Sequence, residues 1–166
     1  MQPGNVYFFT GLSGAGKTTI GGLFYRHIKE KRNDAVLLDG DCLRSIFQDN
    51  GYSHSQRLSG AKRLFRLARM LSEQGLHVVV CSISMYSEVR EWNRANLHGY
   101  REIYIKVSRE TLFRRDKKGL YSAGKNVVGV DLPFDEPKNP DIVVENDGDE
   151  TPEAIVERLE AALGLS

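Results

Sequence analysis

The chain has 166 residues, 40% of them hydrophobic and 27% charged, which are the proportions of an ordinary globular protein with a substantial core. Its 23 Lys and Arg residues nearly balance 22 Asp and Glu residues, so the net charge of +1 gives no global field to recruit nucleic acid or an anionic membrane. Two cysteines are too few for a disulfide framework, and no leader-like start or membrane-length apolar run occurs. These features predict a cytoplasmic protein that has neither nucleic acid nor membrane as a partner.

The first predicted strand, residues 6–10, is an apolar run that stops at a glycine-rich stretch, GLSGAGKTT at residues 11–19. This stretch matches Gly-x-x-x-x-Gly-Lys-Thr and precedes a helical pattern, which is typical of a phosphate-binding loop. Glycines let successive backbone N–H groups point at phosphate oxygens, and the helix adds the positive end of its dipole. We expect Lys17 to reach the β- and γ-phosphates and the Thr18 hydroxyl to bind Mg²⁺. The residues predicted to bind the triphosphate are Gly11, Ser13, Gly14, Ala15, Gly16, Lys17, Thr18 and Thr19.

Strands and helices alternate along the rest of the chain. Apolar runs predict strands at residues 35–38, 77–83, 101–107 and 142–144. Helical spacing of apolar residues predicts helices at residues 17–31, 54–74, 88–97 and 109–117, with a last helix after Thr151. Asp41 would cap a short helix through residue 47, and Ser87 would cap the helix at 88–97. This alternation predicts an α/β P-loop NTPase fold, a single domain over residues 1–166 whose five-stranded parallel sheet has helices on both faces.

Two carboxylates, Asp39 and Asp41, follow the second predicted strand at the sheet edge where ligands bind in open α/β folds. The third strand ends in CSIS without the acidic residue that usually holds Mg²⁺, and no Asn-Lys-x-Asp motif for guanine occurs. These absences favour a kinase over a GTPase. We expect Asp39 to orient or deprotonate an acceptor hydroxyl and to join Thr18 at the metal. Asp41 would help to hold the metal or the substrate, with helix capping alone as the competing explanation.

Basic side chains are needed to neutralise the charge that develops on a transferred phosphoryl group. Arg57 lies nearest the start of a basic helix and is the member of that cluster predicted to turn toward an anionic substrate. Residues 118–140 form a Gly- and Pro-rich segment that we interpret as a closing lid. At its start, Arg115 and Lys118 are expected to reach the nucleotide when the lid closes, although a basic cluster also suits a helix C-terminus.

Six segments, in order, resemble the adenylylsulfate kinase family, which transfers the ATP γ-phosphate to the ribose 3′-hydroxyl of adenylyl sulfate. They are GLSGAGKTT, LDGDCLR at 38–44, GYSHSQR at 51–57, the IS at 83–84, RDKKGLY at 115–121 and GVDLPFDEPKNPD at 129–141. The resemblance implies ATP and Mg²⁺ as cofactors and Asp39 as a catalytic group. It also implies substrate contacts from Arg44, Arg57 and Ser84, and a place for Lys118 near the phosphates, where it would act on the substrate beside Lys17.

The departures from that family all fall on the acceptor side. Gly60 stands where the family has an amide-bearing residue that contacts the substrate. Residues 83–87 (ISMYS) lack a proline and an arginine of the corresponding family segment, and a shorter lid has NVVGVD at 126–131 in place of a Phe-Thr-Gly whose ring stacks on adenine. Losing base stacking costs about 1–3 kcal/mol, which is enough to redirect the choice of nucleotide.

These observations leave an ordered set of functions. Phosphorylation of adenylyl sulfate, giving 3′-phosphoadenylyl sulfate, is the first. Kinases similar to this family act on cytidine diphosphoramidate in capsule modification, and that reaction is a close second. A regulatory module that binds ATP without phosphate transfer is the third, and it is disfavoured by the intact Asp39, Arg57 and Lys118. The sequence leaves open whether the protein forms a homodimer.

Overall fold

The computed structural model describes residues 2–116 and 119–165. At its centre is a five-stranded sheet in the order β2-β3-β1-β4-β5, with every neighbouring pair of strands parallel. The strands are β1 (Val6–Thr10), β2 (Ala35–Asp39), β3 (His77–Cys81), β4 (Arg101–Lys106) and β5 (Ile142–Glu145). Because all strands run the same way, the loops that follow them meet at one edge of the sheet, where an open α/β fold binds its ligands. The sheet predicted from the alternating pattern is confirmed.

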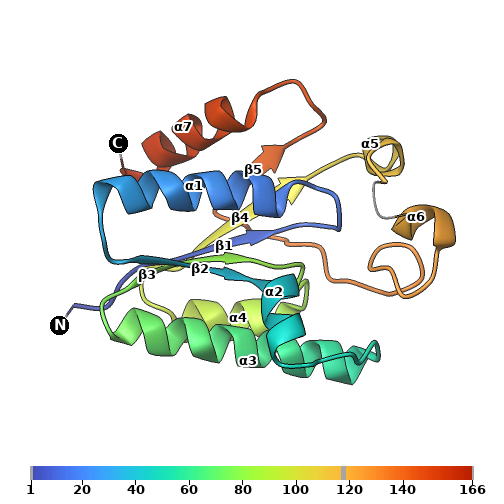
Figure 1. Cartoon of the computed structure of the whole chain (residues 1–166), viewed down its shortest axis with the longest axis horizontal. Helices are drawn as coiled ribbons and strands as arrows, with labels where there is room; N and C mark the ends of the chain where they lie inside the picture. The colour runs from blue at the N-terminus through green and yellow to red at the C-terminus, as the bar shows by residue number, and fades with distance from the viewer. Residues whose placement is uncertain (1, 117–118, 166) are drawn as a thin grey trace.

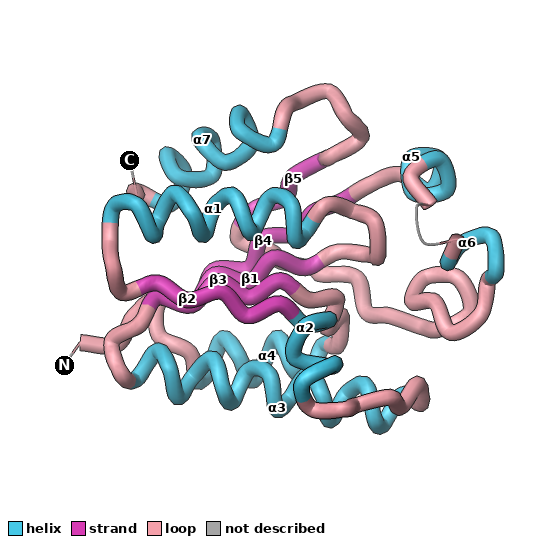
Figure 2. Tube along the Cα trace, in the orientation of Figure 1, coloured by secondary structure: helices cyan, strands magenta, loops and turns pink. Residues whose placement is uncertain are grey.

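Helices cover both faces of this sheet (Figure 1). On one face lie α1 (Lys17–Lys31) and α7 (Pro152–Leu163), and on the other lie α3 (His54–Glu73) and α4 (Ser87–Asn96). Three short helices, α2 (Gly40–Ile46), α5 (Arg109–Arg114) and α6 (Leu120–Ala123), lie toward the carboxyl edge of the strands, and a long loop leads from α6 back to β5 (Figure 2). Within the described residues, no helix has the length and apolar character needed to cross a membrane.

Two apolar cores hold the layers together, one on each face of the sheet. Consecutive side chains of β1 enter opposite cores because the direction of side chains alternates along a strand. Phe9 packs against Phe24 of α1 with ring centroids 5.2 Å apart, whereas Phe8 meets Phe65 of α3 edge to face at 4.8 Å. β1 is therefore buried on both faces of the sheet, and it fixes the loop that follows it.

The residues that cap α2 and α4 differ from those predicted from the sequence. Asp39, and not Asp41, caps α2: its backbone is extended and its Oδ1 accepts a hydrogen bond from the Cys42 amide at 3.0 Å. The helix begins two residues earlier than predicted, so the first carboxylate and not the second meets the free amides of its first turn. Ser87 does not cap α4 either. It is the first helical residue, and its amide donates to the Asp135 carboxylate, so the helix start is fixed by a distant segment.

Strand and lid boundaries also differ. The third strand ends at Cys81 instead of residue 83, because the chain turns at Ser84, which has a φ of +36°. The helix predicted over 109–117 ends at Arg114. The lid predicted as irregular contains α6 and an isolated bridge between Val128 and Leu132 within its described residues. Local order in this segment comes from contacts with the rest of the molecule, which a periodicity argument does not include.

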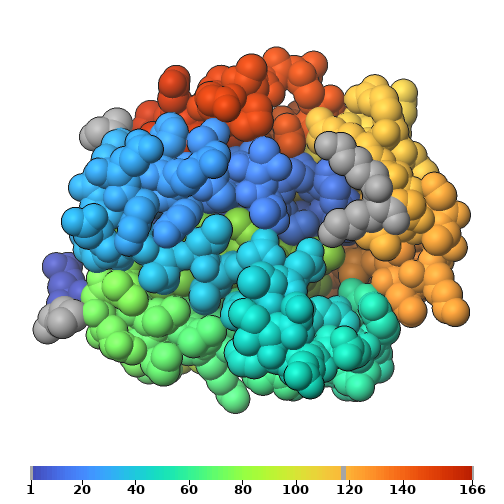
Figure 3. All heavy atoms as spheres, viewed as in Figure 1, coloured from blue at the N-terminus to red at the C-terminus, as the bar shows by residue number. Residues whose placement is uncertain are grey.

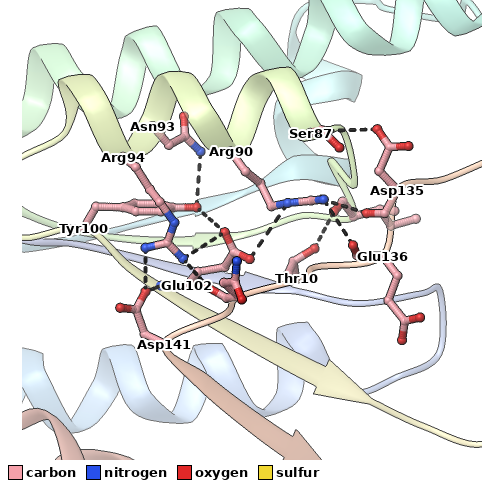
Figure 4. Close-up of polar contacts among 12 residues, drawn as sticks. Thr10, Ser87, Arg90, Asn93, Arg94, Tyr100, Glu102, Asp135, Glu136 and Asp141 are labelled. Atoms are coloured by element: carbon pink, nitrogen blue, oxygen red, sulfur yellow. Dashed lines mark hydrogen bonds and ion pairs between the residues drawn. The ribbon is translucent and has the colours of Figure 1, made fainter.

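A buried ionic network joins α4, β4 and the chain before β5 (Figure 4). The Glu102 carboxylate is only 1% exposed and lies 3.9 Å from Arg90 and 3.7 Å from Arg94. The Tyr100 hydroxyl donates to Glu102 at 3.1 Å, and the Asp141 carboxylate accepts from the Glu102 amide at 2.7 Å. Burial raises the pKa of Glu102 although the two guanidiniums oppose the shift.

The same network holds the end of the predicted lid against the sheet. Arg90 donates to the carbonyl oxygens of Asp135, at 2.7 Å, and Glu136, at 3.3 Å. The Tyr104 hydroxyl of β4 donates to the Glu136 carboxylate, and the Asp135 carboxylate accepts from the Ser87 amide. Residues 135–141 are thereby fixed to α4 and β4, so the part of the lid able to move lies before Asp135.

Candidate active site

The phosphate-binding loop joins β1 to α1 and uses backbone conformations that favour glycine. Gly14 and Gly16 have φ values of 79° and 103°, and Gly16 caps α1 in a left-handed conformation. A Cβ atom on Gly16 would lie 2.6 Å from Nδ2 of Asn146, so space as well as φ excludes a side chain. Lys17 Nζ donates to the Leu12 carbonyl oxygen at 2.9 Å, which holds the ammonium group beside the loop. The loop therefore places the Lys17 ammonium group close to the start of α1, an arrangement that suits the binding of a phosphate.

The Asp39 carboxylate faces this loop from the end of β2. Thr18 Oγ1 donates to Asp39 Oδ2 at 3.0 Å, while Oδ1 is occupied by the Cys42 amide. The cap thus fixes the side chain that meets the threonine of the P-loop. A threonine hydroxyl and a carboxylate at this spacing suit Mg²⁺, which binds few protein ligands and keeps phosphate oxygens and waters. Among the described residues no group of three His, Cys, Asp or Glu side chains forms a separate metal site.

Two arginines that were predicted to contact the acceptor also line the cleft. Arg57 of α3 donates through Nη2 to the Asn126 carbonyl oxygen of the lid at 2.8 Å, and its Nε is buried without a hydrogen-bond partner in the described part of the chain. Burial lowers the pKa of Arg57, and the neighbouring Arg44 adds to the shift. Arg44 donates to the carbonyls of Asp49 and Gly51, so its guanidinium is held by the loop before α3.

Tyr52 lies between these two arginines. Its ring centroid is 4.9 Å from the guanidinium of Arg44 and 5.4 Å from that of Arg57, both in cation–π geometry. The side chain is half exposed in the cleft wall. The contacts of Tyr52 with the two arginines depend on how α2 and α3 fold together.

Asp49 and Gly60 form another part of the acceptor wall that sequence reasoning did not bring together. The Asp49 carboxylate pairs with Arg63 of α3. A Cβ atom on Gly60 would approach Asp49 Oδ2 to 3.1 Å, so the glycine leaves room for the carboxylate at the cleft. Asp49, Gly60 and Arg63 all line the cleft. Asp49 therefore places a carboxylate near the arginines that line this part of the cleft.

Most predicted site residues surround a single cleft of about 810 Å³ at the carboxyl edge of the sheet. Those lining it are Ser13, Gly14, Gly16, Lys17, Thr18, Thr19, Asp39, Asp41, Arg44, Arg57, Ser84 and Arg115. Gly11 and Ala15 are buried behind the loop and are not part of the cleft lining. Lys118 lies outside the described residues. In the space-filling view the teal residues after β2 and the orange residues of the lid lie at the same end of the molecule (Figure 3).

The end of β3 supplies hydroxyl groups where many P-loop proteins have a carboxylate. Ser82 and Ser84 have their Oγ atoms 2.7 Å apart, and both residues line the cleft. Thr10 of β1 donates to the Ile83 carbonyl oxygen at 2.6 Å, which holds the turn that gives Ser84 its positive φ. A Cβ atom on Gly40 would lie 2.8 Å from Ser82 Oγ, so the glycine between the two aspartates lets α2 approach β3.

A phosphate-binding loop on a parallel α/β sheet, with a carboxylate at its threonine and arginines across the cleft, defines a P-loop kinase. The chain belongs to the adenylylsulphate kinase family, whose model matches residues 3–145.

Three proteins illustrate how similar the relatives are. A cytidine diphosphoramidate kinase from Campylobacter jejuni is 41% identical over 85% of this chain and 85% of its own. A probable adenylyl-sulfate kinase from Archaeoglobus fulgidus is 34% identical over 86% of this chain and 96% of its own. The solved structure of a Mycobacterium tuberculosis APS kinase in complex with AMPPNP and APS is 32% identical, with a TM-score of 0.88 over 99% of both chains. The resemblance read from six sequence segments is confirmed.

Proposed function

We propose that the protein transfers the γ-phosphate of ATP, with Mg²⁺, to the ribose 3′-hydroxyl of a nucleotide, and that cytidine diphosphoramidate is this nucleotide. The observation that supports transfer is the 3.0 Å contact between Thr18 of the P-loop and Asp39, at the centre of a cleft that continues to Arg44 and Arg57. In this proposal Thr18 and Asp39 hold the metal between them. Asp39 would also orient the acceptor hydroxyl and take its proton as the oxygen attacks the γ-phosphorus, while the bond from that phosphorus to the β,γ-bridging oxygen breaks and ADP leaves.

The donor side is built to bind a triphosphate. The loop's amides at the head of α1 and the Lys17 ammonium surround the β- and γ-phosphates in this proposal, while Arg115 approaches from the lid side of the cleft. Lys118 is proposed to act at the transferred phosphate with Lys17, although it lies outside the described residues. In this proposal the lid at residues 118–140 closes over the nucleotide through its residues before Asp135, because Arg90 holds the later ones.

The acceptor side calls for an anionic group. The buried Nε of Arg57 is a donor without a partner in the described part of the chain, and a buried donor of this kind needs an acceptor. A phosphate or diphosphate oxygen between Arg57 and Arg44 would supply one. Asp41 and Ser84 line the same space and are proposed to contact the acceptor nucleotide. An ATP-dependent reaction and two unpaired cysteines also suit the reducing cytoplasm, which is the location we propose.

The Asp49 carboxylate favours the cytidine compound over adenylyl sulfate. A carboxylate accepts N–H donors, such as the nitrogen that a diphosphoramidate carries, and it repels a sulfate group. Gly60 leaves room beside that carboxylate, whose Oδ2 is paired with Arg63 and which lines the cleft. The 41% identity with a cytidine diphosphoramidate kinase also supports this order of candidates. Adenylyl sulfate is the second candidate, because the family model and a relative solved with APS favour it.

A competition assay tests this proposal. The protein is mixed with ATP, Mg²⁺ and equal concentrations of cytidine diphosphoramidate and adenylyl sulfate, and the products are quantified by mass spectrometry. We expect most of the phosphorylated product to derive from the cytidine compound, and EDTA to abolish its formation. A majority of 3′-phosphoadenylyl sulfate would favour the second candidate, and ADP with free phosphate alone would contradict both.

Replacing Gly60 by asparagine should shift the choice of acceptor. The new side chain starts 3.1 Å from Asp49 Oδ2, where its amide would cover the carboxylate and present an N–H group to the cleft. We expect kcat/KM for the cytidine compound, relative to adenylyl sulfate, to fall roughly threefold to tenfold, the effect of one hydrogen bond. Gly22→Asn is the matched control, because Gly22 is also helical and a Cβ atom on it would have no neighbour within 4 Å. If the ratio of the two kcat/KM values is unchanged in Gly60→Asn, Asp49 does not determine the choice of acceptor.

A further inference from the structure

Two side chains from outside the P-loop donate hydrogen bonds to carbonyl oxygens of that loop. The Tyr121 hydroxyl of α6 donates to the Ser13 carbonyl oxygen at 2.5 Å. The Asn146 amide, directly after β5, donates to the Ala15 carbonyl oxygen at 2.8 Å. The two donors come from segments 108 and 131 residues away from their acceptors in the sequence, so they meet the loop only in the folded protein.

The geometry of the peptide unit turns these contacts into control over the phosphate site. In a trans peptide the carbonyl of one residue and the N–H of the next point in opposite directions, because the unit is planar. A donor that holds the Ser13 carbonyl in one direction therefore fixes the Gly14 N–H in the opposite direction, and the Asn146 contact does the same for the Gly16 N–H. Within the described residues, no backbone carbonyl accepts a hydrogen bond from the Gly14 or Gly16 amide, and both residues line the cleft.

Glycine makes this support necessary. Gly14 and Gly16 both have positive φ, and a glycine peptide can rotate between several conformations at little cost. Without a fixed carbonyl, the inward N–H groups would spend part of their time turned away from the phosphates. Preorganised donors bind an anion better because no ordering cost is incurred when it arrives.

The tyrosine is itself firmly held. Tyr121 is only 7% exposed, and its ring packs on Phe113 of α5 with centroids 5.5 Å apart. The Asp116 carboxylate accepts from the amides of Tyr121 and Ser122 and from the Ser122 hydroxyl, and these bonds lower the pKa of Asp116. Burial raises the pKa of Tyr121 to about 12, so its hydroxyl keeps the proton that it donates at neutral pH.

We propose that Tyr121 and Asn146 are positioning residues for ATP: they hold the Ser13 and Ala15 carbonyls outward and thereby aim the Gly14 and Gly16 amides at the phosphates. Asn146 belongs to the sheet side and acts at all times. Tyr121 belongs to the lid, so the phosphate site is complete only when α6 is in place over the loop. The inference rests on the proposed ATP site but not on the identity of the acceptor.

The test is ADP binding measured by calorimetry in the full chain, together with steady-state kinetics. Tyr121→Phe keeps the ring and removes only the donor, and Asn146→Ala removes the other donor. Each variant should raise the ADP dissociation constant and the ATP KM about three- to tenfold, the effect of one lost hydrogen bond, while the KM for the acceptor stays within twofold. The double variant should lose more than either single one.

Tyr100→Phe is the matched control. It also removes a buried tyrosine hydroxyl that donates a hydrogen bond, but in the network around Glu102, away from the P-loop. It should lower the melting temperature without changing ADP affinity. Wild-type ADP affinity in both Tyr121→Phe and Asn146→Ala, with or without a lower melting temperature, would overturn the inference. ADP binding by the wild type without phosphorylation of any nucleotide would instead count against the proposed function alone.

Discussion

Replacing Asp39 by asparagine should reduce kcat by about 10²–10⁴-fold, the contribution of a general base, and leave the fold intact. The reason is that the two oxygens of this carboxylate have different partners. Oδ1 accepts from the Cys42 amide and caps α2, and asparagine caps a helix as well as aspartate. Oδ2 faces Thr18, and the negative charge that would hold Mg²⁺ and accept a proton there is lost in the amide.

Steady-state kinetics with saturating ATP and Mg²⁺ check this prediction, with urea unfolding as the measure of stability. Asp39→Ala is the companion variant: it should be as inactive as Asp39→Asn and, in addition, less stable by about 1 kcal/mol because the cap is lost. Asp41→Asn serves as the control for a change of charge at the same sheet edge and should lose less activity. Turnover of Asp39→Asn within threefold of the wild type would remove Asp39 from catalysis and favour a binding module.

Replacing Arg90 by methionine should destabilise the protein by about 3–5 kcal/mol, the cost of leaving a buried charge with one of its partners removed. Arg90 lies 3.9 Å from the Glu102 carboxylate, and its Nη atoms hold the carbonyls of Asp135 and Glu136. Both sets of contacts are lost together. Arg94→Met is the comparison, because its side chain is 40% exposed and water replaces part of its charge.

The dependence of this loss on pH identifies its cause. Burial raises the pKa of Glu102 above 4.5 in the folded protein, so the folded state binds more protons than the unfolded chain above pH 4.5. The stability contributed by Glu102 therefore falls as the pH rises through that range. Without Arg90 the pKa of Glu102 should rise further. The difference in unfolding free energy between Arg90→Met and the wild type should therefore widen as the pH increases. Adding Glu102→Gln should recover part of the loss, and a pH-independent difference in stability would contradict this account.

The parts of the molecule that sequence alone predicts are those that depend on local patterns. The apolar run of β1 and the glycines, Lys17 and Thr18 after it form one motif with a fixed chemical purpose. Asp39 and Arg57 were singled out by their positions at a strand end and a helix start, and both line the cleft. The parallel sheet follows from the alternation of apolar runs and helices, because parallel strands need crossovers.

What the sequence did not predict depends on contacts between distant segments. Asp39 caps α2 in place of Asp41 because the helix starts at Gly40, directly after β2 and two residues earlier than the pattern suggested. Tyr121 and Asn146 meet the P-loop across more than a hundred residues, and neither residue carries a sequence signal for that contact. Asp49 and Gly60 lie together at the cleft, and a Cβ atom on Gly60 would stand 3.1 Å from Asp49 Oδ2. The sequence shows that Gly60 stands in place of an amide-bearing residue, but it does not show that Asp49 lies next to Gly60.

The choice of acceptor changes when structure and relatives are considered together. From the sequence, adenylyl sulfate ranks first because of the breadth of the family, with the cytidine compound second. The acidic side chain beside the arginines and the 41% identical relative reverse this order in our proposal. Both candidates require the same transfer to a sugar hydroxyl, so the central claim about the cleft does not depend on which one is correct.

Phosphorus NMR of the purified product tests that claim most directly. After incubation of the wild-type protein with ATP, Mg²⁺ and the preferred acceptor, the spectrum should contain a new phosphomonoester signal whose phosphorus couples to the H3′ proton of the ribose. A spectrum that contains only ADP and orthophosphate, or a new ester coupled to a proton other than H3′, would contradict transfer to the 3′-hydroxyl.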